Sequence, residues 1–385
     1  MRDLVEIGMG RTARRTYELD DVNIVPSRRT RSSQDVSTCW QLDAYRFDIP
    51  VLAHPTDALV SPEFAIEMGR LGGLAVINGE GLIGRHADVA AKVEQIVAAA
   101  EKEYEGDGPA GAIRLLQQLH AAPLDPELLG AAVSRVREAG VTTAVRVSPQ
   151  NAQALTPTLV AAGIDLLVIQ GTIVTAERVG RAKEGSGEPL NLKTFISELD
   201  VPVVAGGVLD HRTALHLMRT GAAGVICGYG STAGVTTSSE VLGISVPMAT
   251  AIADAAAARR EYLDETGGRY VHVLADGDIH TSGQLAKAIA CGADAVVLGT
   301  PLALATEAAG RGWYWPAAAA HPSLPRGALL EVASGERPAL AQVLNGPSDD
   351  PFGSLNLVGG LRRSMAKAGY CDLKDFQKVG LTVGS

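Results

Sequence analysis

The sequence has few aromatic residues and few cysteines, and both shortages narrow the classes of protein to which it can belong. Aromatic residues make up 4% of the 385 residues, whereas hydrophobic residues make up 46%. Strands covered by helices with small side chains need few aromatic residues, so this composition favours an α/β fold. The four cysteines lie far apart, with neither a CxxC pair nor the spacing of metal ligands, and no metal site is predicted. Cys227 and Cys291 lie in apolar runs, where a small buried side chain is expected.

The chain also lacks an excess of positive charge, a long apolar run and the pattern of a signal peptide. Its formal net charge of −9 argues against nucleic acid as a partner. The arginines clustered between Arg11 and Arg31 are read as part of a solvated or subunit-contacting arm. No apolar run approaches the length of a membrane span, and the first residues carry no apolar core segment. We therefore expect a cytoplasmic protein with no membrane partner.

Several common catalytic motifs are missing as well. The sequence contains no HExxH pair, no Walker loop, no GxSxG turn and no GxGxxG after a first strand. Zinc protease, P-loop and serine hydrolase functions are therefore poorly supported.

One stretch, Val271–Leu302, organises the rest of the chain. An apolar strand ends in the polar loop Asp276-Gly277-Asp278, and Ser282 is expected to cap the helix that follows. A second buried strand then ends at Gly299-Thr300. A strand–helix–strand unit of this length predicts a right-handed parallel crossover with two loops side by side at the carboxyl ends of its strands. Such loops bind phosphorylated ligands in many α/β folds.

The sequence contains eight such apolar strands. Several of them are preceded by the same pattern, in which a helix ends at a glycine, a small or acidic residue follows, and the buried strand then begins. Eight βα units favour a closed (β/α)8 TIM barrel over an open sheet. The predicted strands are 49–53, 74–77, 143–147, 166–169, 202–205, 224–227, 271–275 and 295–298. Residues 83–140 are expected to be mainly helical, with a further strand considered at Ala112–Leu116.

The predicted division of the chain follows from this count. Residues 1–48 are expected to form an N-terminal arm over one barrel end, and residues 49–309 the barrel. Residues 310–357, with two tryptophans and several prolines, predict a long excursion after the eighth strand. Residues 358–385 are expected to return as a C-terminal helix and tail.

In a barrel of this kind, residues just after the strands are the functional candidates. The loop 228–237 is rich in glycine and hydroxyl groups and predicts an anion-binding backbone, although an ordinary surface loop fits too. Asp276 could accept hydrogen bonds from a ribose diol or simply cap its loop, and His54 could be catalytic or packed. A flavin mononucleotide barrel would give much the same pattern. The remaining candidates are Asp57, Asn78, Glu80, Ser148, Gln150, Gln170, Thr172, Gly206, Gly207, Asp210, Asp278, Gly299 and Thr300.

The order of these motifs resembles the IMP dehydrogenase / GMP reductase family over nearly the whole chain. YELDDVNIVPSRR is similar to the family's N-terminal segment, and VPVVAGGV followed by GYGSTAGVTTSSEVLG to its active-site loop. VHVLADGDIHTSGQLAKAIACGADAVVLGT resembles its ribose- and phosphate-binding segment, and LVGGLRRSMAKAGYC its C-terminal signature. No insertion is long enough for paired CBS domains, so the chain is most similar to the short, IMP-dehydrogenase-related branch.

The resemblance assigns roles to individual positions and also shows where the chain departs from the family. The family's nucleophilic cysteine is Val235 here, next to Thr236 and Thr237, so no catalytic residue can be assigned and thioimidate chemistry is not expected. The loop serine that contacts phosphate is Ala233, and the second glycine of the phosphate turn is Asp278. Gln170 replaces an aspartate on the nicotinamide side and is the one cofactor-binding candidate. The nucleotide-binding positions that match are Gly228, Gly230, Asp276, Gly277, Gly299 and Thr300.

By resemblance, the expected function is that of an NAD(P)-linked purine nucleotide oxidoreductase in guanine nucleotide metabolism. The implied cofactor is NAD or NADP, or none if the chain is catalytically silent, and the implied ligand is a purine nucleotide or a similar phosphorylated small molecule. A homotetramer is expected. Two alternatives stay open: a silent homologue that binds a nucleotide or a partner enzyme and regulates it, and a flavin-type barrel oxidoreductase.

Overall fold

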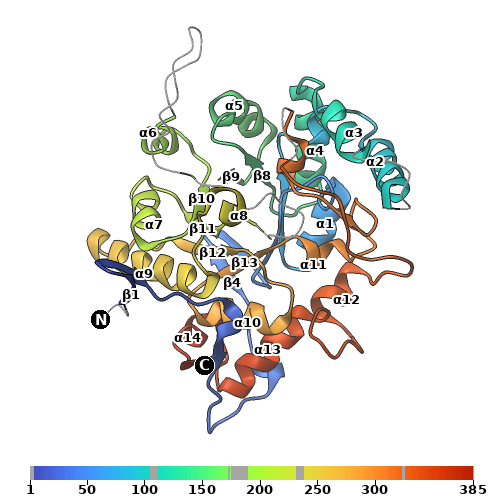
Figure 1. The fold of residues 1–385 in the computed structure, drawn as a ribbon. Coiled ribbons are helices and arrows are strands. Elements are labelled where there is room, and N and C mark those ends of the chain that lie inside the picture. Colours follow the sequence, from blue (N-terminus) through green and yellow to red (C-terminus); the bar gives the residue numbers. More distant parts are fainter. Residues whose placement is uncertain are drawn as a thin grey trace.

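Eight parallel strands close into a barrel at the centre of the molecule (Figure 1). The computed structural model describes residues 4–104, 111–171, 174, 190–230, 238–322 and 326–384. The strand order β6-β7-β8-β9-β10-β11-β12-β13 follows the sequence and closes through the pairing of β13 with β6, for example Val297 with Leu52. The predicted (β/α)8 barrel is confirmed.

Each predicted strand is present within a few residues of its expected bounds. The strands are buried on both faces because helices cover their outer side and their inner side chains fill the barrel. Their bounds are Val51–Ala53 (β6), Leu74–Asn78 (β7), Ala144–Val147 (β8), Leu166–Gln170 (β9), Val203–Val208 (β10), Gly224–Gly228 (β11), His272–Asp276 (β12) and Ala295–Leu298 (β13).

Helices surround this barrel, and polar side chains fix where several of them begin. Ser61 caps α1 by accepting a hydrogen bond from the Phe64 amide, as its position before Pro62 predicts. The expected cap at Ser282 is wrong by one residue, because the Thr281 hydroxyl accepts the bond from the Gln284 amide. The surrounding helices are Pro62–Arg70 (α1), Pro126–Glu138 (α4), Ala152–Ala162 (α5), Leu192–Ser197 (α6), His211–Met218 (α7), Ser238–Leu242 (α8), Met248–Thr266 (α9), Ser282–Ala290 (α10) and Thr300–Ala303 (α11).

The strand considered at Ala112–Leu116 is wrong, because these residues form part of helix α3 (Gly111–His120). Ala112 and Leu116 are four residues apart and both fully buried, which is the spacing of one helical face. This face packs with helix α2 (Val89–Tyr104) and with Trp313 and Trp315 in a second apolar cluster beside the barrel.

The N-terminal residues form small antiparallel units. Strand β1 (Leu4–Gly8) pairs with β2 (Arg11–Arg14), and β4 (Trp40–Leu42) pairs with β5 (Tyr45–Phe47). Leu42, fully buried, reaches the inside of the barrel beside Leu52, Leu74 and Val204, so the β4–β5 hairpin plugs the amino end of the strands.

The segment after the barrel packs back onto it, and its last strand pairs with a strand near the N-terminus. Strand β14 (Trp313–Tyr314) pairs with β15 (Leu330–Glu331), and its aromatic side chains are buried. Helices α12 (Leu340–Asn345), α13 (Leu357–Ala368) and α14 (Leu373–Phe376) follow, and strand β16 (Leu381–Val383) pairs with β3 (Val22–Ile24). Among the described residues, no helix is both long and apolar enough to cross a lipid bilayer.

Candidate functional site

The carboxyl ends of three barrel strands bring together Asp276, Gln170 and His54. Asp276 ends β12 and is 1% exposed. Its Oδ2 accepts a hydrogen bond of 2.6 Å from Nε2 of Gln170, which ends β9. Nδ1 of His54, just after β6, is buried and lies 3.3 Å from the same oxygen. The two neighbours fix the orientation of the carboxylate and leave Oδ1 without a hydrogen bond from the described residues.

Two glycines after β11 allow the chain to lie directly against Asp276. Gly228 has φ +98°, and a Cβ there would lie 2.0 Å from the Asp276 carbonyl oxygen. Gly230 has φ +99°, and its amide donates to that carbonyl over 3.1 Å. A Cβ on Gly230 would lie 3.3 Å from Cε1 of His54. At Gly228 the left-handed backbone and the clash with backbone atoms together exclude a side chain, and at Gly230 the left-handed backbone favours glycine.

A cavity of about 270 Å³ opens above this group. It lies between the N-terminal segment, the ends of β11 and β12, and the start of α9. Four of the six predicted nucleotide-binding residues line it, namely Gly228, Gly230, Asp276 and Gly277. The other lining residues are Glu18, Leu19, Asp20, Leu209, Tyr229, Ser245, Val246, Met248, Asp278 and Gln284.

The other two predicted nucleotide-binding residues, Gly299 and Thr300, are not among the described residues that line the cavity. Gly299 is covered by the ring of Tyr314, whose Oη would lie 2.6 Å from a Cβ on this glycine. The Thr300 hydroxyl lies 3.3 Å from Nδ1 of His280. Val235, Thr236 and Thr237, together with Thr172 and Ala233, lie outside the described residues.

A second polar network lies across the mouth of the barrel, at the ends of β7 and β8. Glu80 accepts hydrogen bonds from Arg146 (2.8 Å), from the Ser148 amide (3.0 Å) and hydroxyl (2.7 Å), and from the Asn151 side chain. Arg146 also donates to the Gln170 carbonyl over 2.8 Å, so it connects this network to the Asp276 group. Burial lowers the pKa of Arg146, and Glu80 and Asp57 oppose that shift. Sequence reasoning missed Arg146, although a lone arginine within an apolar strand was a signal for it.

The described cysteines do not supply a nucleophile to this cavity. Cys227, on β11 one residue before Gly228, is fully buried. Burial, with smaller contributions from Asp254, Asp276 and Asp210, raises the pKa of its thiol far above the usual range. A thiol of this kind stays protonated and unreactive, so Cys227 does not replace the cysteine missing at position 235.

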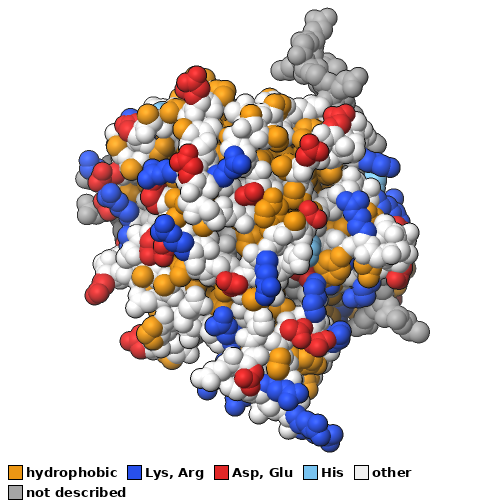
Figure 2. Space-filling view, turned by 180° about the vertical axis from the view of Figure 1, so that it is seen from behind, with side chains coloured by type: hydrophobic (Ala, Val, Ile, Leu, Met, Phe, Trp, Pro, Cys, Tyr) orange, Lys and Arg blue, Asp and Glu red, His pale blue; other side chains and the backbone are white. Residues whose placement is uncertain are grey.

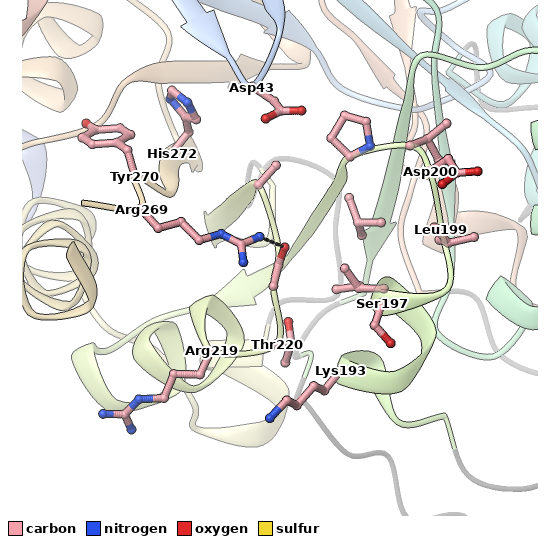
Figure 3. A pocket seen from close by; sticks show the side chains of 16 residues that line it. Asp43, Lys193, Ser197, Leu199, Asp200, Arg219, Thr220, Arg269, Tyr270 and His272 are labelled. Atoms are coloured by element: carbon pink, nitrogen blue, oxygen red, sulfur yellow. Dashed lines mark hydrogen bonds between the residues drawn. The ribbon is translucent and has the colours of Figure 1, made fainter. Parts of the chain in front are cut away.

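A larger cavity, of about 650 Å³, lies at the opposite end of the barrel (Figure 3). Lys193, Arg219 and Arg269 line it together with Asp43 and Asp200. Arg219 is engaged with Glu265, and Arg269 donates to the Gly221 carbonyl over 2.7 Å. Barrel enzymes place their chemistry at the carboxyl ends of the strands, so the smaller cavity at Asp276 is the candidate site.

No group of three or more His, Cys, Asp or Glu side chains within the described ranges is placed to hold a metal ion. The cavity wall combines the glycine backbone after β11 with the oriented carboxylate of Asp276 and three further carboxylates, those of Glu18, Asp20 and Asp278.

Comparison with known proteins gives consistent matches over most of the chain. Residues 16–321 match the model of the IMP dehydrogenase / GMP reductase domain. An uncharacterized oxidoreductase of Mycolicibacterium smegmatis is 86% identical, over 99% of this chain and 100% of that protein. The inosine-5'-monophosphate dehydrogenase of Korarchaeum cryptofilum is 23% identical, over 76% of this chain and 75% of its own. The crystal structure of an IMP dehydrogenase/GMP reductase-like protein from Corynebacterium glutamicum is 60% identical, covers 99% of this chain and 98% of its own, and superimposes with a TM-score of 0.91.

Proposed function

Because the chain belongs to the IMP dehydrogenase / GMP reductase family, we propose that it binds a purine ribosyl ligand at Asp276 and exchanges hydride between that ligand and a nicotinamide cofactor. The purine nucleotides of guanine metabolism are the first ligands that the family suggests. The observation that carries this proposal is the buried, oriented carboxylate of Asp276 on the floor of a glycine-lined cavity.

Asp276 is suited to bind a ribose diol. Its Oδ2 is occupied by Gln170 and faces His54, whereas Oδ1 accepts no hydrogen bond from the described residues. An ionised carboxylate has free lone pairs for two hydroxyl donors, and a carboxylate already held in place loses little entropy when it binds them. Gly228 and Gly230 let the backbone approach the sugar closely.

The end of β9 fits the carboxamide of a nicotinamide cofactor. Gln170 presents a side-chain amide whose Oε1 has no partner among the described residues, while its Nε2 donates to Asp276. Such an amide would hold the ring of NAD or NADP beside the ligand, and the bound cofactor would accept or donate the hydride. Arg146, by donating to the Gln170 carbonyl, keeps this strand end in position.

A second candidate function is that of a catalytically silent homologue, which binds the ligand and regulates a partner enzyme. Val235 stands where the family has its nucleophilic cysteine, and Cys227 is buried with a raised pKa. A third candidate is a flavin-type barrel oxidoreductase, since glycine-rich loops at these strand ends also suit flavin mononucleotide.

Turnover assays distinguish these functions. The purified protein is incubated with IMP and NAD, or with GMP and NADPH, and the nicotinamide absorbance is followed. Turnover that is lost in Asp276→Ala supports the first function. Binding of purine ligands, seen as a thermal shift without turnover, supports the silent homologue. A yellow preparation with flavin absorbance supports the third, and absence of both binding and turnover contradicts the first two.

We also propose that the protein works in the cytoplasm as a homotetramer, without nucleic acid or membrane partners. Basic and acidic side chains are interspersed over the face in Figure 2, rather than gathered by sign. With a net charge of −9, this surface offers no extended basic patch for a phosphate backbone on that face.

A further inference from the structure

His54 is held against the carboxylate of Asp276 by its backbone and by its ring. Its amide donates to the carbonyl of Leu298, the last residue of β13, over 2.9 Å. Pro55 follows, and a residue before proline is confined to extended backbone. Nδ1 of the ring is buried and lies 3.3 Å from Oδ2 of Asp276, and the side chain is 12% exposed. An imidazole fixed in this way loses little entropy when it binds a ligand.

The carboxylate of Asp276 determines which nitrogen of the neutral imidazole carries the proton. An ionised oxygen beside Nδ1 favours the tautomer with the proton on Nδ1, since a lone pair there would face a negative charge. Nε2 is then a hydrogen-bond acceptor. Neither Nε2 of His54 nor Oδ1 of Asp276 has a hydrogen bond with the residues that the structure describes. The site therefore presents two acceptors, one neutral and one ionised.

The position of Gly230 shows that these two acceptors reach the same place. A Cβ on Gly230 would lie 3.3 Å from Cε1 and 3.7 Å from Nε2 of His54, and 4.0 Å from Oδ1 of Asp276. Gly230 and Asp276 both line the cavity of about 270 Å³, so the place where the acceptors converge lies at its wall. Two acceptors that converge from the ends of β6 and β12 suit two neighbouring hydroxyl donors. A ribose carries such a pair, at its 2' and 3' carbons.

We propose that His54 is a specificity-determining residue, which shares the ribose diol with Asp276. Nε2 of His54 accepts a hydrogen bond from one hydroxyl, and Oδ1 of Asp276 accepts one from the other. The inference rests on the proposed function, which places a purine ribosyl ligand at Asp276, and it adds that the site selects ribose over deoxyribose. A buried acceptor that loses its donor costs free energy, so a ligand without either hydroxyl binds more weakly.

Calorimetric titration of the full chain, without a nicotinamide cofactor, tests this role. The ligands are GMP, 2'-deoxy-GMP and 3'-deoxy-GMP, and the same three forms of IMP. We expect each deoxy form to bind the wild-type protein about tenfold more weakly than the ribose form. In His54→Ala the ribose form should also weaken about tenfold. The deoxy form that lacks the hydroxyl bound by His54 should weaken less than about twofold, because that contact is already missing.

Two conservative variants separate a direct contact from an effect through Asp276. Asparagine can place its amide N–H group near the position of Nδ1 and keep a donor to Asp276, whereas glutamine can place its amide oxygen near the position of Nε2. If His54 contacts the ribose, His54→Gln should restore the preference for ribose, and His54→Asn should not. His216→Ala, which removes an exposed histidine on α7, is the matched control and should leave every affinity unchanged. Thermal unfolding of each variant establishes that it is folded.

The possible failures of this inference and of the proposed function give different results. Equal weakening of all three forms in His54→Ala, or a preference for ribose that His54→Asn alone restores, would overturn the role of His54 while the proposed function stands. The same holds if the wild-type protein binds the ribose and deoxy forms equally well. If the wild-type protein binds none of these nucleotides, the proposed function fails, and the role of His54 fails with it.

Discussion

At the residue scale, the glycine at the end of β11 decides whether the candidate cavity can form. Gly228 combines φ +98° with a virtual Cβ only 2.0 Å from the Asp276 carbonyl oxygen. Backbone atoms cannot move aside as the end of a side chain can, so any side chain at position 228 must push β11 and β12 apart.

The first prediction compares two glycine-to-alanine variants. Gly140 also has a positive φ, +75°, but nothing lies within 4 Å of its virtual Cβ. We expect Gly140→Ala to cost about 1 kcal/mol of unfolding free energy, from the left-handed backbone alone. Gly228→Ala should cost roughly 3 kcal/mol or more and abolish ligand binding, because the clash adds to the backbone cost. Urea denaturation measures the unfolding free energy of each variant, and ligand titration measures its binding. Equal losses of unfolding free energy in the two variants would contradict the close approach of Gly228 to the Asp276 backbone.

The sequence located the members of the Asp276 group but not their contacts. Asp276, Gln170 and His54 could each be placed after a strand, since the apolar runs end just before them. Gln170 and Asp276 are 106 residues apart, and the bond between them depends on barrel geometry and side-chain rotamers that no local pattern encodes.

At the element scale, a buried charge cluster fastens α9 and α14 to strand β12. Asp294 is 2% exposed and accepts hydrogen bonds from Arg259 on α9 (2.7 Å), Lys374 on α14 (2.6 Å) and the Val273 amide on β12 (2.9 Å). Although burial acts in the opposite direction, Arg259 and Lys374 hold the pKa of Asp294 well below its usual range. His272 lies beside this cluster, with Nδ1 3.8 Å from Asp294.

The second prediction concerns the pH dependence of stability that His272 produces. Burial lowers the pKa of His272 to about 4, with Lys374 and Arg259 acting in the same direction and Asp294 and Asp43 opposing. The unfolded chain binds a proton here below a pH of about 6.5, whereas the folded chain does so only near pH 4. Between these values the unfolded state holds more protons, so stability falls as the pH is lowered, by up to roughly 3 kcal/mol from this group.

Urea denaturation between pH 4 and 7 measures this contribution as a difference between variants. His272→Gln cannot titrate and should lose less stability over this range than the wild-type protein. His216→Gln, which changes an exposed histidine on α7, should follow the wild-type curve. Parallel curves for wild-type and His272→Gln would show that His272 does not titrate differently in the two states.

Whether a segment forms a helix or a strand could be predicted wherever the spacing of its apolar residues fitted only one of the two. Buried parallel strands are continuous apolar runs, so all eight were found within a few residues. The short run Ala112–Leu116 is ambiguous, because a buried helical face and a strand both place apolar residues within five positions; packing against Trp313 and Trp315 selects the helix. The Thr281 cap was missed because threonine and serine stand side by side there, and either can cap a helix.

At the scale of the whole molecule, the N-terminal hairpin formed by β1 and β2 is a separate two-stranded sheet outside the barrel. In Figure 1 its strand β1 lies along α9, at the edge of the molecule. Arg14, at the end of β2, pairs with Asp254 on that helix (2.7 Å and 3.1 Å). Just after the hairpin, the Tyr17 amide donates to the Thr250 hydroxyl (2.8 Å) and the Thr250 amide to the Tyr17 carbonyl (3.2 Å). Leu4, Ile7 and Met9 are 62%, 65% and 102% exposed. An isolated two-stranded hairpin is marginally stable in water, and exposed apolar residues gathered on one unit are typical of a contact surface.

The third prediction is that this hairpin contributes to the proposed homo-oligomer. The double variant Ile7→Lys, Met9→Lys places two like charges on the hairpin, and their desolvation in a subunit contact is costly. We expect light scattering after gel filtration to give a smaller mass for this variant than for the wild-type protein, with an unchanged mass for Val160→Lys, which alters an exposed valine on α5. Because no core side chain changes, the far-ultraviolet circular dichroism of the double variant should match that of the wild type. If the mass stays the same while the protein is oligomeric, the contact lies elsewhere; if the wild-type protein is itself a monomer, the homotetramer is wrong and the exposed hairpin needs another partner.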